Sequence, residues 1–319
     1  MRNIYILLIG ILFLSACQST SNSKKAEKVT AQPFPFTQVP AMISNEAQKS
    51  EYAVKHFWND YFVLAQKSCR DTLLVGGVGK DSFTKAFTTY ISLLEVTSPE
   101  TIKIAQDSLL TKAERIEIAH PESIIWDKII SLSEKYLFDP NSPYRNEECY
   151  IPVLEKMGST SIVSDDEKTR SLYLLSLCSL NRLEHKAANF TYTLKNGRTG
   201  QLYDTKSEYI LLFFSNPDCE NCKEIIEQLS KSQKIQQLIE QKRLAVINIY
   251  PDEDLTAWYD YLPNYPDTWI NGFDQEQVLN SKTIYYIRAI PSLYLLNKEK
   301  EVIYKDAPPF KIFQYLNSI

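Results

Sequence analysis

A buried strand followed at once by two cysteines constrains the fold of this chain more than any other feature. Residues 209–214 (Tyr-Ile-Leu-Leu-Phe-Phe) form an apolar run, and a short polar link joins them to Cys219 and Cys222. Apolar residues then recur at the spacing of one helix face, at Ile225, Ile226 and Leu229. Because backbone N–H groups at a helix N-terminus favour thiolate over thiol, this order of elements predicts a reactive dithiol.

The length and composition indicate two folded units with real hydrophobic cores. The chain has 319 residues, 44% of them hydrophobic, and a formal charge of −4. Its only lysine cluster, Lys24-Lys25, lies in a polar stretch. The sequence therefore lacks the basic footprint of a nucleic-acid-binding protein, and we expect no nucleic-acid partner.

The first residues are typical of a secretion signal. Residues 1–16 contain Arg2 and an apolar run that is too short to span a bilayer. Leu-Ser-Ala-Cys17 resembles the lipobox of bacterial lipoproteins, which implies that Cys17 is lipidated and begins the mature chain. Gln18 in place of Asp favours the outer membrane over the inner one, and we expect a lipid-anchored protein of the cell envelope that faces the periplasm. An ordinary signal peptide with an accidental cysteine is the alternative.

An extracytoplasmic location permits disulfides, so the remaining cysteines matter. If Cys17 is acylated, five are left: Cys69, Cys149, Cys178, Cys219 and Cys222. This odd number leaves at least one thiol unpaired unless it bonds another molecule. We expect Cys69, Cys149 and Cys178 to be small buried side chains, and a Cys69–Cys149 disulfide stays open.

Residues 17–40 and 41–186 differ sharply in pattern. Residues 17–40 are rich in Ser, Lys, Thr, Gln and Pro without an apolar period, which predicts a flexible tether. Residues 41–186 predict an all-helical domain of about six helices. These lie near 45–62, 81–94, 99–118, 121–132, 142–157 and 165–180, and Pro121 is expected to open the fourth.

The helical domain offers little chemistry. Gly76-Gly-Val-Gly-Lys80 has the wrong spacing for a phosphate-binding loop, and Asp81 stands where Ser or Thr would hold Mg²⁺. We therefore expect a loop that precedes a helix. The three histidines (His56, His120 and His185) are scattered, so no metal site is predicted.

Residues 187–319 predict a mixed central sheet flanked by helices, so the fold class is an all-α domain followed by an α/β domain. Strands are expected at 190–194, 201–203, 209–214, 244–250, 292–296 and 302–304. The cysteine helix is expected to run to about Lys242, so that the strands on either side of it pair in parallel. Residues 252–282 form an insertion with helical stretches near 255–262 and 275–279, and a final helix covers 310–316.

These features together resemble the thioredoxin fold. The resemblance rests on Cys-x-x-Cys after a buried strand and on Ile290-Pro291 just before a later strand. It implies that Pro291 is cis and packs beside the dithiol. The hairpin and the insertion narrow the resemblance, over about 189–319, to membrane-anchored thiol–disulfide oxidoreductases related to cytochrome-c maturation reductases and alkyl hydroperoxide reductases. The helical half, notably 136–148, resembles a domain of unknown function found ahead of thioredoxin-like domains in bacterial lipoproteins.

The chain departs from that family at three positions. Asp218 stands in place of an aromatic residue, Phe213 in place of an acidic one, and Asn221 in place of the common proline. These departures bear on the redox potential and the route of proton transfer, while the fold assignment is unaffected.

The dithiol chemistry follows from the order of the two cysteines along the helix. Cys219, at the exposed helix start, is expected to attack a substrate disulfide, and Cys222, one turn further, to resolve the mixed disulfide. The family resemblance implies that Ile290 and Pro291 present backbone to an extended substrate strand and keep metals off the thiols. No cofactor is expected beyond the dithiol itself.

Charged neighbours predict the direction of the reaction. Asp218 and Glu220 place negative charge beside Cys219, which disfavours its thiolate and makes the pair more reducing. Lys223 acts in the opposite sense, and Asn221 completes the set expected to tune the thiol pKa. We therefore predict a reductase or isomerase of extracytoplasmic protein disulfides, recharged by a membrane thiol donor as in relatives.

Four alternatives compete with a redox-active dithiol. A zinc site needs two further ligands at motif spacing, and haem attachment needs His at the position of Lys223. A serine hydrolase is unsupported because Gly-x-Ser-x-Gly is missing from the sequence. A purely structural disulfide is the fourth. The alternative function is a binding or scaffold lipoprotein whose helical half recognises a partner while the thioredoxin-like module is weakly active or inactive.

Overall fold

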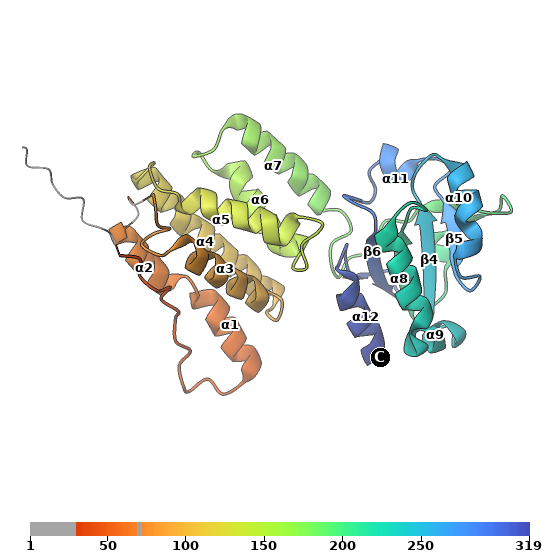
Figure 1. Cartoon of the computed structure of the whole chain (residues 1–319), viewed down its shortest axis with the longest axis horizontal. Helices are drawn as coiled ribbons and strands as arrows, with labels where there is room; N and C mark the ends of the chain where they lie inside the picture. Colours follow the sequence, from red (N-terminus) through yellow and green to blue (C-terminus); the bar gives the residue numbers. More distant parts are fainter. Residues whose placement is uncertain (1–29, 69, 71) are drawn as a thin grey trace, which may run out of the picture. The chain divides into compact units, whose positions relative to one another are not determined.

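The computed structural model describes residues 30–68, 70 and 72–319. The expected signal peptide (1–16), Cys17, most of the expected tether and Cys69 therefore lie outside the described residues. Ala31–Ile319 form one compact unit, in which a helical region (residues 46–178) precedes a mixed sheet with helices (Figure 1). This confirms the predicted fold class. Within the described residues, no helix combines the length and hydrophobicity needed to cross a membrane.

In its described residues, the helical region consists of seven α-helices and one π-helical stretch. They are α1 (Glu46–His56), α2 (Asn59–Ser68), α3 (Lys80–Leu94), α4 (Pro99–Ala119), α5 (Ile125–Ser133), the π-helical stretch Glu134–Phe138, α6 (Glu147–Ser159) and α7 (Asp165–Cys178). Their core is one apolar cluster that is unusually rich in aromatic rings, among them Phe34, Trp58, Tyr61, Phe83 and Tyr90. Such rings bury a large apolar area each, which stabilises the bundle.

Helix boundaries differ from the predictions at three places. The predicted helix 45–62 is interrupted at Phe57 and Trp58, and both rings pack into the aromatic cluster. Pro121 does not open a helix: α5 begins only at Ile125, whose N–H donates to the Ser123 hydroxyl at 3.2 Å. The helix expected from residue 142 begins at Glu147, because Asn146 caps its N-terminus.

The sheet region is built on seven strands in the order β2-β1-β5-β4-β3-β6-β7. They are β1 (Thr191–Leu194), β2 (Thr199–Gln201), β3 (Tyr209–Phe214), β4 (Leu244–Tyr250), β5 (Ile270–Phe273), β6 (Ser292–Asn297) and β7 (Val302–Tyr304). β3 and β5 both run parallel to β4, and the other pairs are antiparallel. The predicted hairpin and the parallel pair are confirmed, whereas β5, inside the expected insertion, was missed.

In the described sheet region, five α-helices and two 3₁₀ turns accompany the strands, and each face of the sheet has its own apolar cluster. The helices are α8 (Glu220–Lys231), α9 (Gln233–Glu240), α10 (Leu255–Tyr261), α11 (Val278–Ser281) and α12 (Pro309–Ser318), with 3₁₀ turns at Leu202–Asp204 and Leu262–Asn264. The predicted cysteine helix is therefore two helices, and Ser232 caps the second. Along β3, Leu211 and Phe213 join the cluster under α8, while Leu212 and Phe214 join the opposite cluster. Both faces of β3 are buried, as the sequence predicted.

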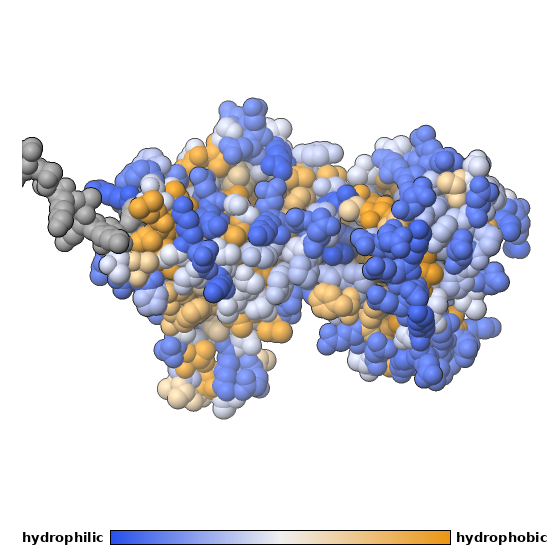
Figure 2. All heavy atoms as spheres, in the orientation of Figure 1, coloured by the Kyte–Doolittle hydropathy of each residue, from blue (hydrophilic) through white to orange (hydrophobic). Residues whose placement is uncertain are grey.

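The visible surface carries mixed polar and apolar side chains, with larger apolar areas over the helical region (Figure 2). Exposed apolar residues of that region include Val63, Ile104, Ile118, Leu172 and Tyr173.

Candidate functional site

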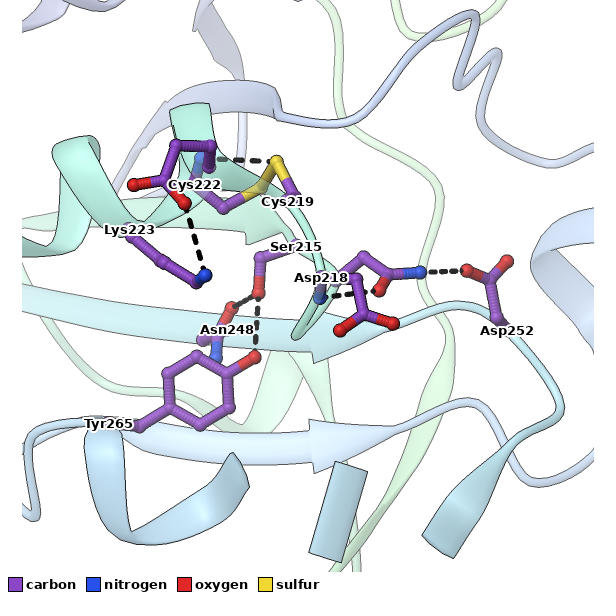
Figure 3. Close-up of a disulfide and its surroundings, with 10 residues drawn as sticks. Ser215, Asp218, Cys219, Cys222, Lys223, Asn248, Asp252 and Tyr265 are labelled. Carbon is purple, nitrogen blue, oxygen red and sulfur yellow. Dashed lines mark hydrogen bonds and ion pairs between the residues drawn. A yellow bond between two sulfur atoms is a disulfide. The ribbon is translucent and has the colours of Figure 1, made fainter. Parts of the chain in front are cut away.

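Cys219 and Cys222 form a disulfide at the N-terminus of α8, with an S–S distance of 2.24 Å (Figure 3). Cys219 is the N-cap residue, and its sulfur accepts a hydrogen bond from the backbone N–H of Cys222 at 3.1 Å. Cys222 is buried against the apolar cluster under α8, whereas Cys219 is partly exposed. The outer sulfur is therefore Cys219, and the helix N–H that it accepts from would stabilise its thiolate in the reduced state.

A polar link between β3 and α8 fixes the position of the first cysteine. The Asn216 side-chain oxygen accepts from the Asp218 N–H at 3.1 Å, and the Asn216 amide donates to the Asp252 carboxylate (Figure 3). The Cys219 N–H donates to the Asn216 carbonyl at 3.2 Å. This local turn, in which Asn216 bonds its own backbone two residues on, turns the chain from strand to helix.

The four residues expected to tune the thiols, Asp218, Glu220, Asn221 and Lys223, are all exposed. Lys223 Nζ lies 3.1 Å from Glu220 Oε2, and the hydrogen bond to Glu220 raises the pKa of Lys223. Asp218 forms no ion pair in the described part of the chain. The Glu220–Lys223 pair sums to zero charge, so Asp218 leaves the surroundings of Cys219 with a net negative charge.

Ile290 and Pro291 lie at the same end of the sheet as the dithiol. Their peptide bond is cis. Ser292, the next residue, pairs with Phe214 in the antiparallel ladder between β6 and β3. Pro291 is thus level with the start of the link that carries Cys219, and Ile290 packs against the cluster that also contains Cys222. The structure therefore brings together the two cysteines and the Ile-Pro segment, which the sequence placed about 70 residues apart.

A buried polar network on the α8 side of the sheet was not predicted. Ser215 Oγ donates to Asn248 Oδ1 at 2.5 Å and lies 3.3 Å from Tyr265 Oη (Figure 3). Asn248 Nδ2 donates to Asn271 Oδ1 at 3.1 Å. Burial raises the pKa of Tyr265, so its hydroxyl is neutral at physiological pH. The network places uncharged hydrogen-bonding groups on the sheet face that Cys222 packs against. Phe213 lies on the same face and stands in place of the acidic residue of the family, so no carboxylate comes from that position.

One signal in the sequence pointed to this network. Asn248 is the only amide side chain within the otherwise apolar or aromatic strand Leu244–Tyr250, and a buried polar side chain needs a partner. Its partner Ser215 lies in a link, while its partner Asn271 and the Ser215 partner Tyr265 lie in the insertion, so the sequence pattern gave no means of pairing them.

The other two described cysteines are buried thiols of low expected reactivity. Cys149 and Cys178 are free and buried, as expected, and burial raises the pKa of each thiol to about 12. Among the residues that the structure describes, no group of three or more His, Cys, Asp or Glu side chains is placed to hold a metal ion.

Comparison with known proteins matches both halves of the chain to families. Residues 16–181 match a domain of unknown function, DUF5106, and residues 207–302 match a family described as thioredoxin-like. None of the curated proteins matches the chain.

Solved structures resemble the whole chain or its second half. A crystal structure of a thioredoxin-like protein from Bacteroides caccae is 38% identical, with a TM-score of 0.78 over 91% of this chain and 99% of that one. The C-terminal domain of an uncharacterized protein from Bacteroides fragilis is 48% identical over 43% of this chain and 98% of its own, with a TM-score of 0.42. The thioredoxin domain of a thiol-disulfide oxidoreductase from Bacteroides vulgatus is 17% identical over 43% and 96%, with a TM-score of 0.38.

Proposed function

Because the chain belongs to the DUF5106 family and carries a thioredoxin-like domain behind that domain, we propose that it is a thiol–disulfide oxidoreductase acting through Cys219 and Cys222. One observation carries the proposal. A partly exposed cysteine caps a helix, its partner is buried one turn further, and the cis Ile290–Pro291 segment lies at the same sheet end. A merely structural disulfide has no need of that asymmetry in exposure.

The reaction is a two-step exchange that transfers two electrons to the substrate. The Cys219 thiolate attacks one sulfur of a substrate disulfide, forming a mixed disulfide and releasing the first substrate thiolate. The Cys222 thiolate then attacks the Cys219 sulfur, which releases the second substrate thiolate. Each released thiolate takes up a proton. The substrate disulfide is reduced, and the enzyme is left with the Cys219–Cys222 disulfide.

The net negative charge around Cys219 supports a reductase or isomerase over a strong oxidant. Asp218 disfavours the Cys219 thiolate, and loss of thiolate stabilisation destabilises the reduced pair. A stronger electron donor has a lower midpoint potential. A midpoint potential near about −120 mV, the strongly oxidising end of the range, would contradict this direction.

The cellular setting is also part of the proposal. Lipidation at Cys17 would tether the enzyme to the periplasmic side of the envelope, with the outer membrane favoured over the inner one. Its partners would be thiols or disulfides of periplasmic proteins and a membrane thiol donor that recharges the pair. This setting is that of the cytochrome-c maturation and alkyl hydroperoxide reductase-related group that the sequence resembles. Cys17→Ser should move the protein from the membrane fraction to the soluble one.

A trapping experiment tests the proposed function in the native cell envelope. In full-length Cys222→Ser, the mixed disulfide on Cys219 cannot be resolved, so covalent partners should accumulate and be identified by mass spectrometry. Cys219→Ser/Cys222→Ser is the matched control and should trap none. If Cys222→Ser also traps none, the oxidoreductase proposal fails and a binding or scaffold role gains support.

A further inference from the structure

A joint of five charged side chains is buried where the helical region contacts the sheet region within the compact unit Ala31–Ile319. Its members are Arg145, Glu147, Arg288, Lys305 and Asp306, and each side chain is 10% exposed or less. Removing such charges from water is costly unless each one is paired with good geometry. We call this cluster the ionic joint.

Every member of the ionic joint has an oppositely charged or carbonyl partner across the contact. Across the contact, Arg288 Nε lies 3.3 Å from Glu147 Oε1. Within the sheet region, its Nη2 lies 2.8 Å from Asp306 Oδ2. Lys305 Nζ lies 2.6 Å from Glu147 Oε2. Arg145 donates to the Asp306 carbonyl at 2.7 Å. Glu147 thus forms ion pairs with two cations of the sheet region at once. Loss of its charge would leave Arg288 with Asp306 as its only anionic partner among the described residues, and Lys305 with the carbonyls of Cys178 and Leu180.

Arg288 is also held by aromatic rings. Its guanidinium carbon lies 4.6 Å from the ring centroid of Phe138 and 5.9 Å from that of Tyr286. Its Nη1 donates to the Phe138 carbonyl. Tyr286 in turn packs against the core of the helical region and stacks with Phe138. The segment from Tyr286 to Arg288 is therefore anchored on the helical region by an ion pair, ring contacts and one hydrogen bond.

The ionic joint holds the chain on both sides of the Ile290–Pro291 segment. Arg288 precedes Pro291 by three residues, and Ser292 directly follows Pro291. Ser292 Oγ donates to Asp306 Oδ1 at 2.9 Å, while the other oxygen of that carboxylate binds Arg288. One carboxylate thus fixes the chain on both sides of Pro291, and Arg145 fixes the backbone of Asp306 from the helical region.

We propose that the helical region positions the substrate-binding Ile290–Pro291 segment through the Glu147–Arg288 contact, so that Arg288 and Glu147 are positioning residues for exchange with protein disulfides. This rests on the proposed function. A protein substrate needs this segment, because its extended backbone must align there. A small aromatic disulfide has no such backbone and needs only the exposed Cys219 sulfur. The ionic joint therefore affects the reaction with protein disulfides and leaves the reaction with small disulfides unchanged.

The test compares full-length Arg288→Met and Glu147→Gln with the wild type. Arg243→Met is the control, since Arg243 and Glu208 form a half-exposed ion pair at the opposite end of β3 and β4. The KM and kcat for insulin disulfides are measured alongside the rate at which reduced protein reacts with dithiobis-nitrobenzoate. We expect KM for insulin to rise about 5- to 10-fold with kcat within about 2-fold, and an unchanged nitrobenzoate rate. The control should match the wild type.

Several results would overturn the proposal. One is an unchanged KM in folded variants, and another is an equal loss with the small disulfide. Glu147→Gln keeps the shape of the side chain, and Arg288→Lys keeps the charge and is expected to give an intermediate KM. If Arg288→Met does not fold, the KM values of Glu147→Gln and Arg288→Lys test the proposal in its place.

Hydrogen exchange of the peptide 286–293 gives a readout independent of turnover. The exchange should be faster in Glu147→Gln and unchanged in the control Arg243→Met. If the wild type itself does not reduce insulin, the proposed function fails, whereas unchanged exchange contradicts the joint alone.

Discussion

The sulfur of Cys219 accepts a hydrogen bond from the backbone N–H of Cys222, 3.1 Å away, in the first turn of α8. In the reduced protein this N–H and the positive end of the helix would face a thiolate instead of a disulfide sulfur. The contact distinguishes the two thiols: one lies at the helix terminus and is partly exposed, and the other is buried behind it.

Among the cysteines that the structure describes, we predict that Cys219 alone reacts fast with iodoacetamide near neutral pH in the reduced protein. The helix N-terminus and the Cys222 N–H should favour the thiolate form of Cys219 in the reduced protein. Burial raises the pKa of Cys149 and Cys178 to about 12, so these two should stay unmodified below pH of about 9 until the protein unfolds. The alkylation rate is followed against pH. Fast alkylation that mass spectrometry maps to Cys149 or Cys178, or a loss of Cys219 as the fast-reacting site in the wild type, would contradict the assignment.

Neutralising Asp218 should make the pair less reducing. Asp218→Asn removes a negative charge that disfavours the Cys219 thiolate, so the thiol pKa should fall and the midpoint potential should rise by on the order of 10 to 30 mV. Lys223→Gln removes a positive charge and should shift the potential the other way. Equilibration with glutathione buffers measures both values, and Glu240→Gln, at the exposed end of α9, is the control. Shifts of the same sign in both variants would refute the electrostatic explanation.

Asn248 should be important for stability because its side chain serves two buried partners. Asn248→Ala removes the bonds that the Ser215 hydroxyl and the Asn271 side-chain oxygen make to Asn248, and it leaves Ser215 only its 3.3 Å contact with Tyr265. The cost is about 1–3 kcal/mol for each group that stays unsatisfied. Asn264→Ala is the control, because that exposed amide donates only to the Tyr261 carbonyl, and its effect should lie within about 0.5 kcal/mol. Urea unfolding of both variants measures the difference. Similar midpoints would show that the buried network does not stabilise the sheet region.

The glycine loop before α3 allows a stability test in the helical region. Gly76 has φ +56°, and a Cβ there would lie 2.7 Å from Tyr61 Oη and 2.8 Å from Ala65 Cβ. Gly76→Ala should therefore lower the free energy of unfolding by about 2–4 kcal/mol, from backbone strain and overpacking together. Gly79 has room, since the nearest atom would lie at 3.9 Å, and Gly79→Ala should cost less than about 1 kcal/mol. Thermal unfolding compares the two, and equal losses would be inconsistent with the packing of Tyr61.

The sequence predicted those parts of the site whose residues are neighbours along the chain. The apolar run 209–214 and the two cysteines after it are read directly from spacing, because a buried strand and a helix start are local features. The strand β5 was missed because Ile270-Asn-Gly-Phe is short and has no regular apolar alternation. Its pairing is decided by β4 and β1 beside it.

Contacts between residues far apart in the chain could not be predicted. Glu147 lies in the stretch 136–148 that carries the resemblance of the helical half, yet its partner Arg288 is 141 residues away and belongs to no motif. The same holds for Ser215, whose role depends on Asn248 and Tyr265. Charge pairing and hydrogen bonding across the fold follow from packing, which one sequence does not specify.

The most direct test of the central claim is the reduction of insulin disulfides by dithiothreitol, with full-length wild type compared with Cys219→Ser. If Cys219 is the attacking thiol of a redox-active pair, the wild type should accelerate the reaction and the variant should fall to the rate without protein. Equal rates for the two proteins would contradict the account and leave the Cys219–Cys222 pair as a structural disulfide.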